Sequence, residues 1–573
     1  MASVETSNQA GKVPAYEALA SDIRNLGVDA VFGLMSDDTA LFCTTLDSMG
    51  VRFYGARHEN NAVAMAEGYA ASSGKLGIAI IGRGPATANA MHGAVYAQRS
   101  GSRVLMIFGA PPISVGVSPD GLGPDGKALD AAALMQASGI KTFTATDSVN
   151  ARRTLAQAID ATAAIGCVAL LLPTNVQFGL IDPETTAMPA PAAPKPAAPK
   201  PGRSPAIDLA ATVLAKARRP LFVVGLGAYK SGARDAILKL ADETGAVVAT
   251  TLKAKDMFRG YPYNLGVIGS FSHAAGRRLM DQADAVVVFG AGLNQRTTSF
   301  GTSMPENVPL VQIDRVRTNI GRWFHADVAI VADARDAAEQ LSKSLAPKGA
   351  SDKPFHVQET RARLADFDMA SEFVPAPTPR TMDPRSVALE IDRMLPADRN
   401  VVYDTGNFLQ ILPYVTSQGP GQHKNAHDFS SIGMGFGTAL GFAVGAPDRP
   451  TAFFLGDGSF LMTMGELETV VREDIPLISV WMNDCAYGAE LHYLKMRNMP
   501  LNMSVFPDID YAPVAAAFGF QSATVRTLDE LKALAPMLSK PEGPIFLDCK
   551  INASIMAPFL LETMDHERRK AGG

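Results

Sequence analysis

The sequence is poor in the residues and runs that mark several specialised classes of protein. Its four cysteines form no CxxC pair and lie near no cluster of histidines. This scarcity argues against a zinc site and against a disulfide framework. No apolar run reaches the roughly 18 residues needed to cross a membrane, and no basic stretch followed by an apolar run opens the chain. We therefore expect a cytoplasmic protein whose cysteines are reduced packing residues.

An excess of charge of one sign is also missing. The formal net charge is −5 over 573 residues, which is too small to predict a nucleic-acid or membrane partner. Apolar residues make up 47% and charged residues 19% of the chain, as in ordinary globular proteins. These values favour a small-molecule partner over a charged macromolecule.

The chain is too long for one hydrophobic core, and its composition marks where it divides. The run MPAPAAPKPAAPKPGRSP at 188–205 alternates Pro, Ala and Lys and predicts an extended linker. A weaker break lies within 351–384, which ends in the Pro-rich VPAPTPRTMDP. We therefore predict a first domain over 1–187, a middle domain over 206–350 and a third domain over 385–573.

Each domain alternates short apolar runs with helical patterns, as expected for parallel strands joined by crossover helices. Several of the runs end in Gly or Asp, at the edge where open α/β sheets bind ligands. The sequence thus predicts an α/β protein of three tandem, doubly wound parallel sheets. The predicted strands are AVFGLM (30–35), LGIAIIG (76–82), RVLMIFG (103–109) and CVALLLP (167–173); PLFVVGLG (220–227), AVVATTL (246–252), DAVVVFGAG (284–292) and VPLVQID (308–314); and NVVYDTG (400–406), TAFFLGDG (451–458), LISVWMND (477–484) and PIFLDC (544–549).

One strand of the third domain ends in a motif suited to a metal-bound phosphate. Its last residues, Gly456 and Asp457, are followed by Gly458, Ser459 and a predicted helix. Glycines let the backbone approach an anion, and a helix N-terminus offers free N–H groups to a phosphate. Asp457 could ligate a cation that bridges to that phosphate. Alone, the motif is more typical of an ordinary Asp-Gly turn between strand and helix.

The next strand strengthens the metal hypothesis. It ends in Asn483 and Asp484, one helix and one strand after Asp457, so the two carboxylates are expected at neighbouring strand ends. Mg²⁺ takes about six oxygens, commonly a few from the protein and the rest from phosphate and water. The backbone carbonyl of Ala486 could supply a third protein oxygen.

These motifs resemble those of the thiamine diphosphate enzymes, the superfamily of acetolactate synthase, pyruvate decarboxylase and benzaldehyde lyase. The resemblance spans almost the whole chain and implies pyrimidine-binding, middle Rossmann-like and diphosphate-binding domains, in that order. In the family, GDG is followed by Asn-Asn, and the second Asn is a metal ligand. Here Asp484 takes that place. Thiamine diphosphate and Mg²⁺ are the implied cofactors, with Asp457, Asp484 and Ala486 as metal ligands and Gly458, Ser459 and Tyr487 beside the cofactor.

The resemblance also assigns a catalytic role to Glu59, which follows Arg57 and His58 at a strand–helix junction. In the family this Glu hydrogen-bonds the pyrimidine N1′. A carboxylic acid held there favours the imino tautomer that activates the reactive thiazolium carbon. The alternative is a Glu that caps its own helix.

Further cofactor contacts are implied in the third domain. Ile432 follows Ser431 and precedes a helix of small residues, where relatives carry a large aliphatic residue that holds the cofactor bent. A core Ile is the alternative. The run from Asp404 to Asn407, which ends the first strand of this domain, resembles a loop that touches the diphosphate, and Gly406 and Asn407 are its implied cofactor contacts.

Substrate selection stays open. Asp37 and Glu490 fall where pyruvate decarboxylases carry catalytic acids, and two such carboxyl groups could share and move a proton. Asp37 could instead cap a helix, and Glu490 could be a solvated helix residue. The segment from Tyr487 to Tyr493 looks more like benzaldehyde lyase, whereas the loop 82–89 resembles acetolactate synthase with Arg83 in place of Ser.

Two function hypotheses follow. The preferred one is a thiamine diphosphate- and Mg²⁺-dependent enzyme that acts on a 2-oxo acid, aldehyde or acyloin, as a decarboxylase, carboligase or lyase. The other is an inactive cofactor-binding scaffold or regulatory subunit, which the retention of Glu59 argues against. Glycines of the middle domain resemble a flavin-binding edge, so FAD stays open but is not favoured. The resemblance further implies a homodimer or homotetramer, with cofactor sites between subunits.

Overall fold

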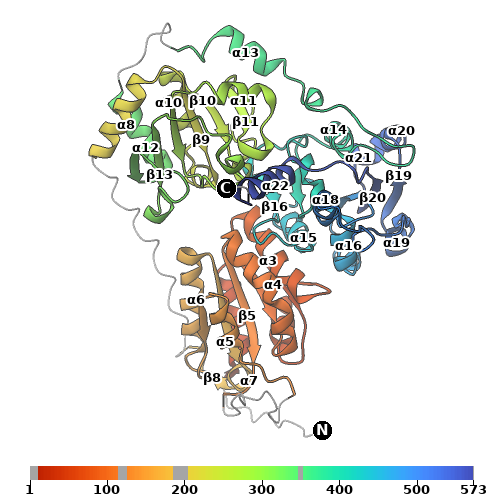
Figure 1. The fold of residues 1–573 in the computed structure, drawn as a ribbon. Coiled ribbons are helices and arrows are strands. Elements are labelled where there is room, and N and C mark those ends of the chain that lie inside the picture. Colours follow the sequence, from red (N-terminus) through yellow and green to blue (C-terminus); the bar gives the residue numbers. More distant parts are fainter. Residues whose placement is uncertain (1–10, 114–125, 185–203, 346–352, 572–573) are drawn as a thin grey trace.

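The computed structural model describes residues 11–113, 126–184, 204–345 and 353–571. Three parallel six-stranded sheets, each flanked by helices, form three α/β domains. Figure 1 shows the first domain at the bottom, the middle domain at upper left and the third at right. The C-terminal helix α22 (Pro558–Ala571) lies where the three domains meet. No described helix is long and apolar enough to span a membrane.

The first domain holds the sheet of order β3-β2-β4-β5-β7-β6 and a short antiparallel pair, β1 and β8. Its strands are β1 (Val13–Pro14), β2 (Ala30–Leu34), β3 (Arg52–Gly55), β4 (Gly77–Ile81), β5 (Val104–Ala110), β6 (Thr142–Thr144), β7 (Cys167–Pro173) and β8 (Leu180–Ile181). Its helices are α1 (Ala15–Asn25), α2 (Ala40–Ser48), α3 (Glu59–Ser73), α4 (Pro85–Ser100), α5 (Ala131–Ala137), α6 (Ala151–Ile165) and α7 (Thr174–Phe178).

The middle domain holds the sheet of order β11-β10-β9-β12-β13-β14. Its strands are β9 (Pro220–Val224), β10 (Val247–Thr250), β11 (Asn264–Val267), β12 (Ala285–Phe289), β13 (Leu310–Asp314) and β14 (Val328–Val331). Its helices are α8 (Pro205–Lys216), α9 (Leu226–Lys230), α10 (Arg234–Thr244), α11 (Ala274–Met280) and α12 (Ala334–Ser344).

The third domain holds the sheet of order β16-β15-β17-β18-β20-β19. Its strands are β15 (Asn400–Tyr403), β16 (His423–Asn425), β17 (Thr451–Gly456), β18 (Leu477–Asn483), β19 (Gln521–Val525) and β20 (Ile545–Lys550). Besides α22, its helices are α14 (Pro384–Met394), α15 (Gly435–Gly445), α16 (Asp457–Thr463), α17 (Glu466–Arg472), α18 (Gly488–Met496), α19 (Ala512–Phe518), α20 (Leu528–Ala533) and α21 (Ala535–Ser539).

The predicted buried strands are confirmed. Of the strands at the edges of the three large sheets, the sequence indicated only β3, through the strand–helix junction before Glu59. All the apolar runs proposed as strands form inner strands of the three sheets. The edge strands β3, β6, β11, β14, β16 and β19 are partly exposed. Because an edge strand buries less of its surface than an inner one, it lacks the continuous apolar run that identifies a strand covered on both faces.

The predicted linkers differ in how much of them can be described. The segment 188–205 lies outside the described residues up to position 203, and Pro205 already begins α8 behind an N-cap at Ser204. The described part of 351–384 contains helix α13 (Gln358–Ala365) and the 3₁₀ helix η6 (Met369–Glu372). This second segment is therefore partly helical.

The first and third domains share one hydrophobic core. Phe32 and Met106 of the first domain belong to the same buried cluster as Phe436 and Trp481 of the third. Helices α3 and α15 form the contact, and glycines let their backbones approach closely. A Cβ on Gly68 would lie 2.1 Å from the Thr438 carbonyl oxygen. The two domains are thus placed by close backbone packing, within a single chain.

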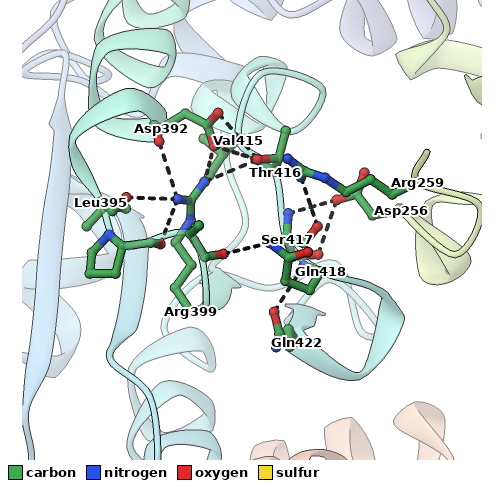
Figure 2. Close-up of polar contacts among 12 residues, drawn as sticks. Asp256, Arg259, Asp392, Leu395, Arg399, Val415, Thr416, Ser417, Gln418 and Gln422 are labelled. Atoms are coloured by element: carbon green, nitrogen blue, oxygen red, sulfur yellow. Dashed lines mark hydrogen bonds and ion pairs between the residues drawn. The ribbon is translucent and has the colours of Figure 1, made fainter. Parts of the chain in front are cut away.

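A polar network around residues 415–422 joins the middle and third domains (Figure 2). Asp256 of the middle domain accepts hydrogen bonds from the backbone N–H of Ser417 at 2.9 Å and from its hydroxyl at 3.1 Å. On the other side, buried Arg399 pairs with Asp392, which also accepts the N–H of Thr416 at 2.7 Å. The network fixes the segment that continues into β16 and then into residues 430–433.

Candidate functional site

Three aspartates lie at strand ends along the carboxyl edge of the third sheet. Asp404 follows β15, Asp457 follows β17 and Asp484 follows β18. These strands are consecutive neighbours in the sheet, and Gly456 pairs with Met482 in register. The strand order reverses direction between β15 and β17, which is where open α/β sheets form a binding crevice. The spacing in the sequence thus correctly predicted adjacent strand ends for Asp457 and Asp484.

Asp457 and Asp484 form a closely interacting pair. Burial raises the pKa of Asp457 to about 6, although the backbone N–H of Ala486 donates to its carboxylate at 2.9 Å. Burial and the neighbouring Asp457 charge raise the pKa of Asp484 well above its usual range. Two carboxylates that crowd each other in this way resist ionising together unless a cation lies between them.

This donor set fits Mg²⁺. Within the described ranges, no three His, Cys, Asp or Glu side chains gather into a metal-binding group, so protein carboxylates alone would not complete a cation's shell. Two acidic oxygens and a backbone carbonyl suit an ion that takes its remaining ligands from phosphate and water. Asp457 and Asp484 would hold the metal, and the carbonyl of Ala486, in the turn that follows Asp484, would complete the protein's share.

Gly458 is required by the packing of the same edge. A Cβ at this position would lie 2.6 Å from the ring of Tyr487 and 3.7 Å from Cδ1 of Ile432. Ile432 is half-buried and faces the GDG turn, whereas nearby Met434 is buried against Tyr96 of the first domain. The structure thus brings Ile432, Gly458 and Tyr487 together beside the aspartate pair.

Asp404 organises this edge, a role that the sequence did not single out. It is fully buried, and burial raises its pKa to about 6. Its carboxylate accepts the hydroxyl of Ser459 and the backbone N–H of Gly433, the latter at 3.0 Å. Ser459 therefore donates its proton to Asp404. Its position at a strand end was the only signal that could have identified Asp404.

The side chain of Asn407 is hydrogen-bonded to the C-terminal segment. Its amide donates to the carbonyl of Ile555 at 2.9 Å and accepts the N–H of Ala557 at 2.8 Å. The preceding Gly406 begins the same 3₁₀ turn, η7 (Asn407–Ile411). One donor and one acceptor of the Asn407 side chain are thus used to hold the C-terminal segment.

Glu59 begins α3 and is held by the adjacent helix of its own domain. Its carboxylate is buried and accepts the side-chain amide of Asn89 at 3.1 Å. One turn further along α4, Nε2 of His92 lies 2.6 Å from the hydroxyl of Ser431. Helix α4 therefore contacts both Glu59 and the residue preceding Ile432. Asn89 and His92 were not predicted, because the sequence placed Asn89 in a loop over 82–89. In the structure α4 already begins at Pro85, and the three-residue spacing puts both side chains on one face of the helix.

The two acids expected on the reaction side differ from each other in their surroundings. Asp37 is exposed and pairs with Lys127 at 2.6 Å, which lowers its pKa. Its neighbour Asp38 is buried and accepts the hydroxyl of Ser36 at 2.7 Å. Glu490 is exposed in the first turn of α18. Asp37 follows β2 in the first domain and Glu490 follows β18 in the third, and no described contact joins them.

Family models match all three domains. The N-terminal thiamine pyrophosphate (thiamine diphosphate) binding domain matches residues 14–118, the central domain 207–341 and the C-terminal binding domain 404–549. The chain belongs to the thiamine pyrophosphate enzymes. The family thus accounts for the order of the domains and for cofactor binding by the first and third.

Similar thiamine pyrophosphate enzymes carry out more than one reaction. A probable acetolactate synthase large subunit of Methanocaldococcus jannaschii is 25% identical over 95% of this chain and 93% of its own length. A sulfoacetaldehyde acetyltransferase of Alcaligenes xylosoxydans xylosoxydans is 27% identical over 92% and 90%. A probable 2-ketoarginine decarboxylase of Pseudomonas aeruginosa is 28% identical over 90% of both. These relatives support an enzyme of this family and leave its substrate undetermined.

A cavity of about 1030 Å³ lies between the three domains, beside the carboxyl edge of the middle sheet. It reaches Ser430, next to the Ile432 loop, but neither Asp457 nor Asp484 lines it. Cations predominate among its charged lining residues, which favours an anionic occupant. They are Lys75, Arg103, Lys230, Lys253, Arg296 and Lys424, with Asp428 as the acidic residue.

Proposed function

We propose that the protein is a thiamine diphosphate- and Mg²⁺-dependent enzyme that decarboxylates a 2-oxo acid, joins the resulting acyl unit to an acceptor, or does both. The observation that carries the proposal is the pairing of Asp457 with Asp484 at neighbouring strand ends, in a chain whose first domain keeps Glu59 buried. Bound thiamine diphosphate would supply a nucleophilic carbon and an electron sink.

The residues of this chain would divide the work. Asp457, Asp484 and the carbonyl of Ala486 would hold Mg²⁺ against the diphosphate. Glu59 would exchange a proton with the pyrimidine ring, in a buried position that Asn89 fixes by its hydrogen bond. Ile432, which lies close to Gly458, would pack against the bound cofactor.

Proton handling at the substrate would fall to Asp37, which follows β2 of the first domain, and Glu490, in the first turn of α18. The ion pair with Lys127 keeps Asp37 ionised over a wide pH range. An ionised carboxylate can accept a proton from the reacting group, and a second carboxyl group can return it. Substrate would approach between these two chain segments.

Activity assays with several classes of substrate distinguish this function from its alternatives. Purified protein stripped of cofactor is incubated with 2-oxo acids, aldehydes and acyloins, with and without thiamine diphosphate and Mg²⁺, while CO₂ and carbonyl products are measured. Cofactor-dependent CO₂ release supports the decarboxylase or carboligase. Cleavage of acyloins without CO₂ release would favour a lyase of the benzaldehyde lyase type.

A scaffold or regulatory subunit is the candidate of another class. It would bind thiamine diphosphate and Mg²⁺ with no turnover of any substrate in the panel. A protein that binds no thiamine diphosphate, with Mg²⁺ present, would contradict the enzyme and the scaffold alike. Calorimetric titration of the same preparation with cofactor separates these outcomes.

We further propose a homodimer or homotetramer. The family resemblance supports it, and contacts between α3 and α15 that form within one chain could equally form between two. The cation-rich cavity beside the middle sheet is compatible with FAD, which the sequence leaves open without favouring it; a flavin spectrum of the purified protein tests that assignment. A cytoplasmic location remains an expectation from the sequence.

A further inference from the structure

Two charged side chains are buried behind the proposed metal site and have no part in the mechanism above. Asp548 and Lys550 lie on β20 and are 0% and 1% exposed. Lys550 Nζ is 3.1 Å from the Asp548 carboxylate and donates to the carbonyl of Ile509 at 2.5 Å. Burial of such a pair is costly unless each group finds good partners. Its place at the carboxyl edge of the sheet calls for an explanation.

The pair reaches the metal-binding turn through Asn483. Lys550 is the register partner of Asn483, the last residue of β18. The amide N–H of Asn483 donates to Asp548 at 2.8 Å, and its carbonyl oxygen accepts the backbone N–H of Cys485 at 3.1 Å. A carboxylate can only accept, so Asp548 fixes which end of the Asn483 amide faces the turn.

The turn needs this support. Cys485 has φ of +55°, a left-handed conformation that is uncommon and strained for a residue other than glycine. On either side of it stand Asp484 and Ala486, the latter bonded to Asp457 through its N–H. The hydrogen bond from Cys485 to Asn483 holds the strained residue while two carboxylates are brought together.

We propose that Asp548 and Lys550 are positioning residues for the Mg²⁺ site, acting through Asn483 on the turn 483–487. The inference rests on the proposed function, because it needs Asp457 and Asp484 to bind the metal. We call the hydrogen bonds from Asn483 to Asp548 and from Cys485 to Asn483 the relay. With the relay intact, the turn has its final conformation before Mg²⁺ binds. Without the relay, binding must also drive the turn into its strained shape.

The test measures Mg²⁺ affinity on cofactor-free protein at saturating thiamine diphosphate, by calorimetric titration, together with the melting temperature. The double variant Asp548→Asn, Lys550→Met removes both charges at once, so no unpaired buried charge remains. Asn483→Ala breaks the relay at its other end and supplies the test if the double variant does not fold. Substitutions of outer-shell partners typically weaken metal binding about 10- to 100-fold, and we expect a loss of about tenfold or more in both.

Thr451→Val is the matched control. Thr451 is fully buried at the opposite end of β17 and accepts a hydrogen bond from Asn400 at 3.1 Å. This variant should lower the melting temperature and leave Mg²⁺ affinity unchanged. Relay variants that fold and bind Mg²⁺ within about twofold of wild type would overturn the inference. A wild type that shows no Mg²⁺-dependent binding at all would overturn the proposed function and the inference with it.

Discussion

Gly441→Ala should move helix α15 of the third domain away from helix α3 of the first domain, and with it the site residues that each domain supplies. A Cβ at this position would lie 1.8 Å from the carbonyl oxygen of Met65, on the facing helix α3. Ordinary non-bonded separations are about 3.5 Å, so the helices must move apart by roughly 1.5 Å. The obstacle is backbone and not a flexible side chain, which means that no rotamer change can relieve it.

Moving the two helices apart should lower activity, because both helices begin at the candidate site. Glu59 is the first residue of α3, and Ile432 precedes α15. Overpacking of this kind costs about 1–3 kcal/mol of stability. A misplacement of about 1 Å between reacting groups can cost on the order of 10²-fold in rate, so activity should fall more than the melting temperature alone would suggest.

The assay compares variants of the same interface. Gly437→Ala would place its Cβ 2.6 Å from the Asn61 carbonyl oxygen and should have a smaller effect. Gly465→Ala would make an ordinary 3.5 Å contact with Arg57, from a helical backbone conformation, and should behave like wild type. Melting temperature and Mg²⁺-dependent binding of thiamine diphosphate are measured for all three. A Gly441→Ala variant that matched Gly465→Ala in both would refute this account of the interface.

Further substitutions test individual roles in the site. Glu59→Gln should bind the cofactor nearly as well as wild type yet lose about 10²-fold or more in turnover, because an amide cannot relay a proton; wild-type turnover would contradict its role. Ile432→Ala should weaken cofactor binding and cost up to about 2–5 kcal/mol of unfolding free energy, and unchanged affinity and rate would make it an ordinary core residue. Asp37→Asn should slow turnover more than it weakens cofactor binding, as kinetic and binding titrations would show; equal losses would favour a structural cap. Asp484→Asn should keep Mg²⁺-dependent activity because the amide retains an oxygen ligand, whereas Asp457→Asn should lose much more; comparable losses in metal titrations would contradict the family pattern.

The sequence predicted the inner structure of each domain better than its margins. Strands such as β5 and β18 are buried on both faces, and their continuous apolar runs identify them. An edge strand such as β6, whose residues are half-buried or exposed throughout, gives no comparable signal. Pairing of edge strands depends on the neighbouring strand, which may lie far away in the sequence, so local patterns cannot reveal it.

The same division applies to the candidate site. Asp457 and Asp484 were predictable because glycines, strand ends and a fixed interval mark them in the sequence. Asp404 and Asp548 were not, because their importance lies in what they contact: the Ser459 hydroxyl for one and the Asn483 amide for the other. Buried acids at strand ends become recognisable only when the order of the strands is known. Tertiary structure therefore adds the supporting residues to a site whose outline the sequence already contains.

The shared core changes how the two-domain site should be understood. Glu59 begins α3 and Ile432 lies just before α15, and the glycines of these two helices permit a contact too close for any larger residue. That contact depends on the two surfaces and not on the chain that joins them. If the first domain of one subunit packs on the third domain of another, the same glycines and the Glu67–Lys424 ion pair at 2.6 Å would form between subunits. In either arrangement the geometry of the candidate site is set by helix packing, so substitutions at this interface should alter cofactor binding without touching a cofactor-binding residue.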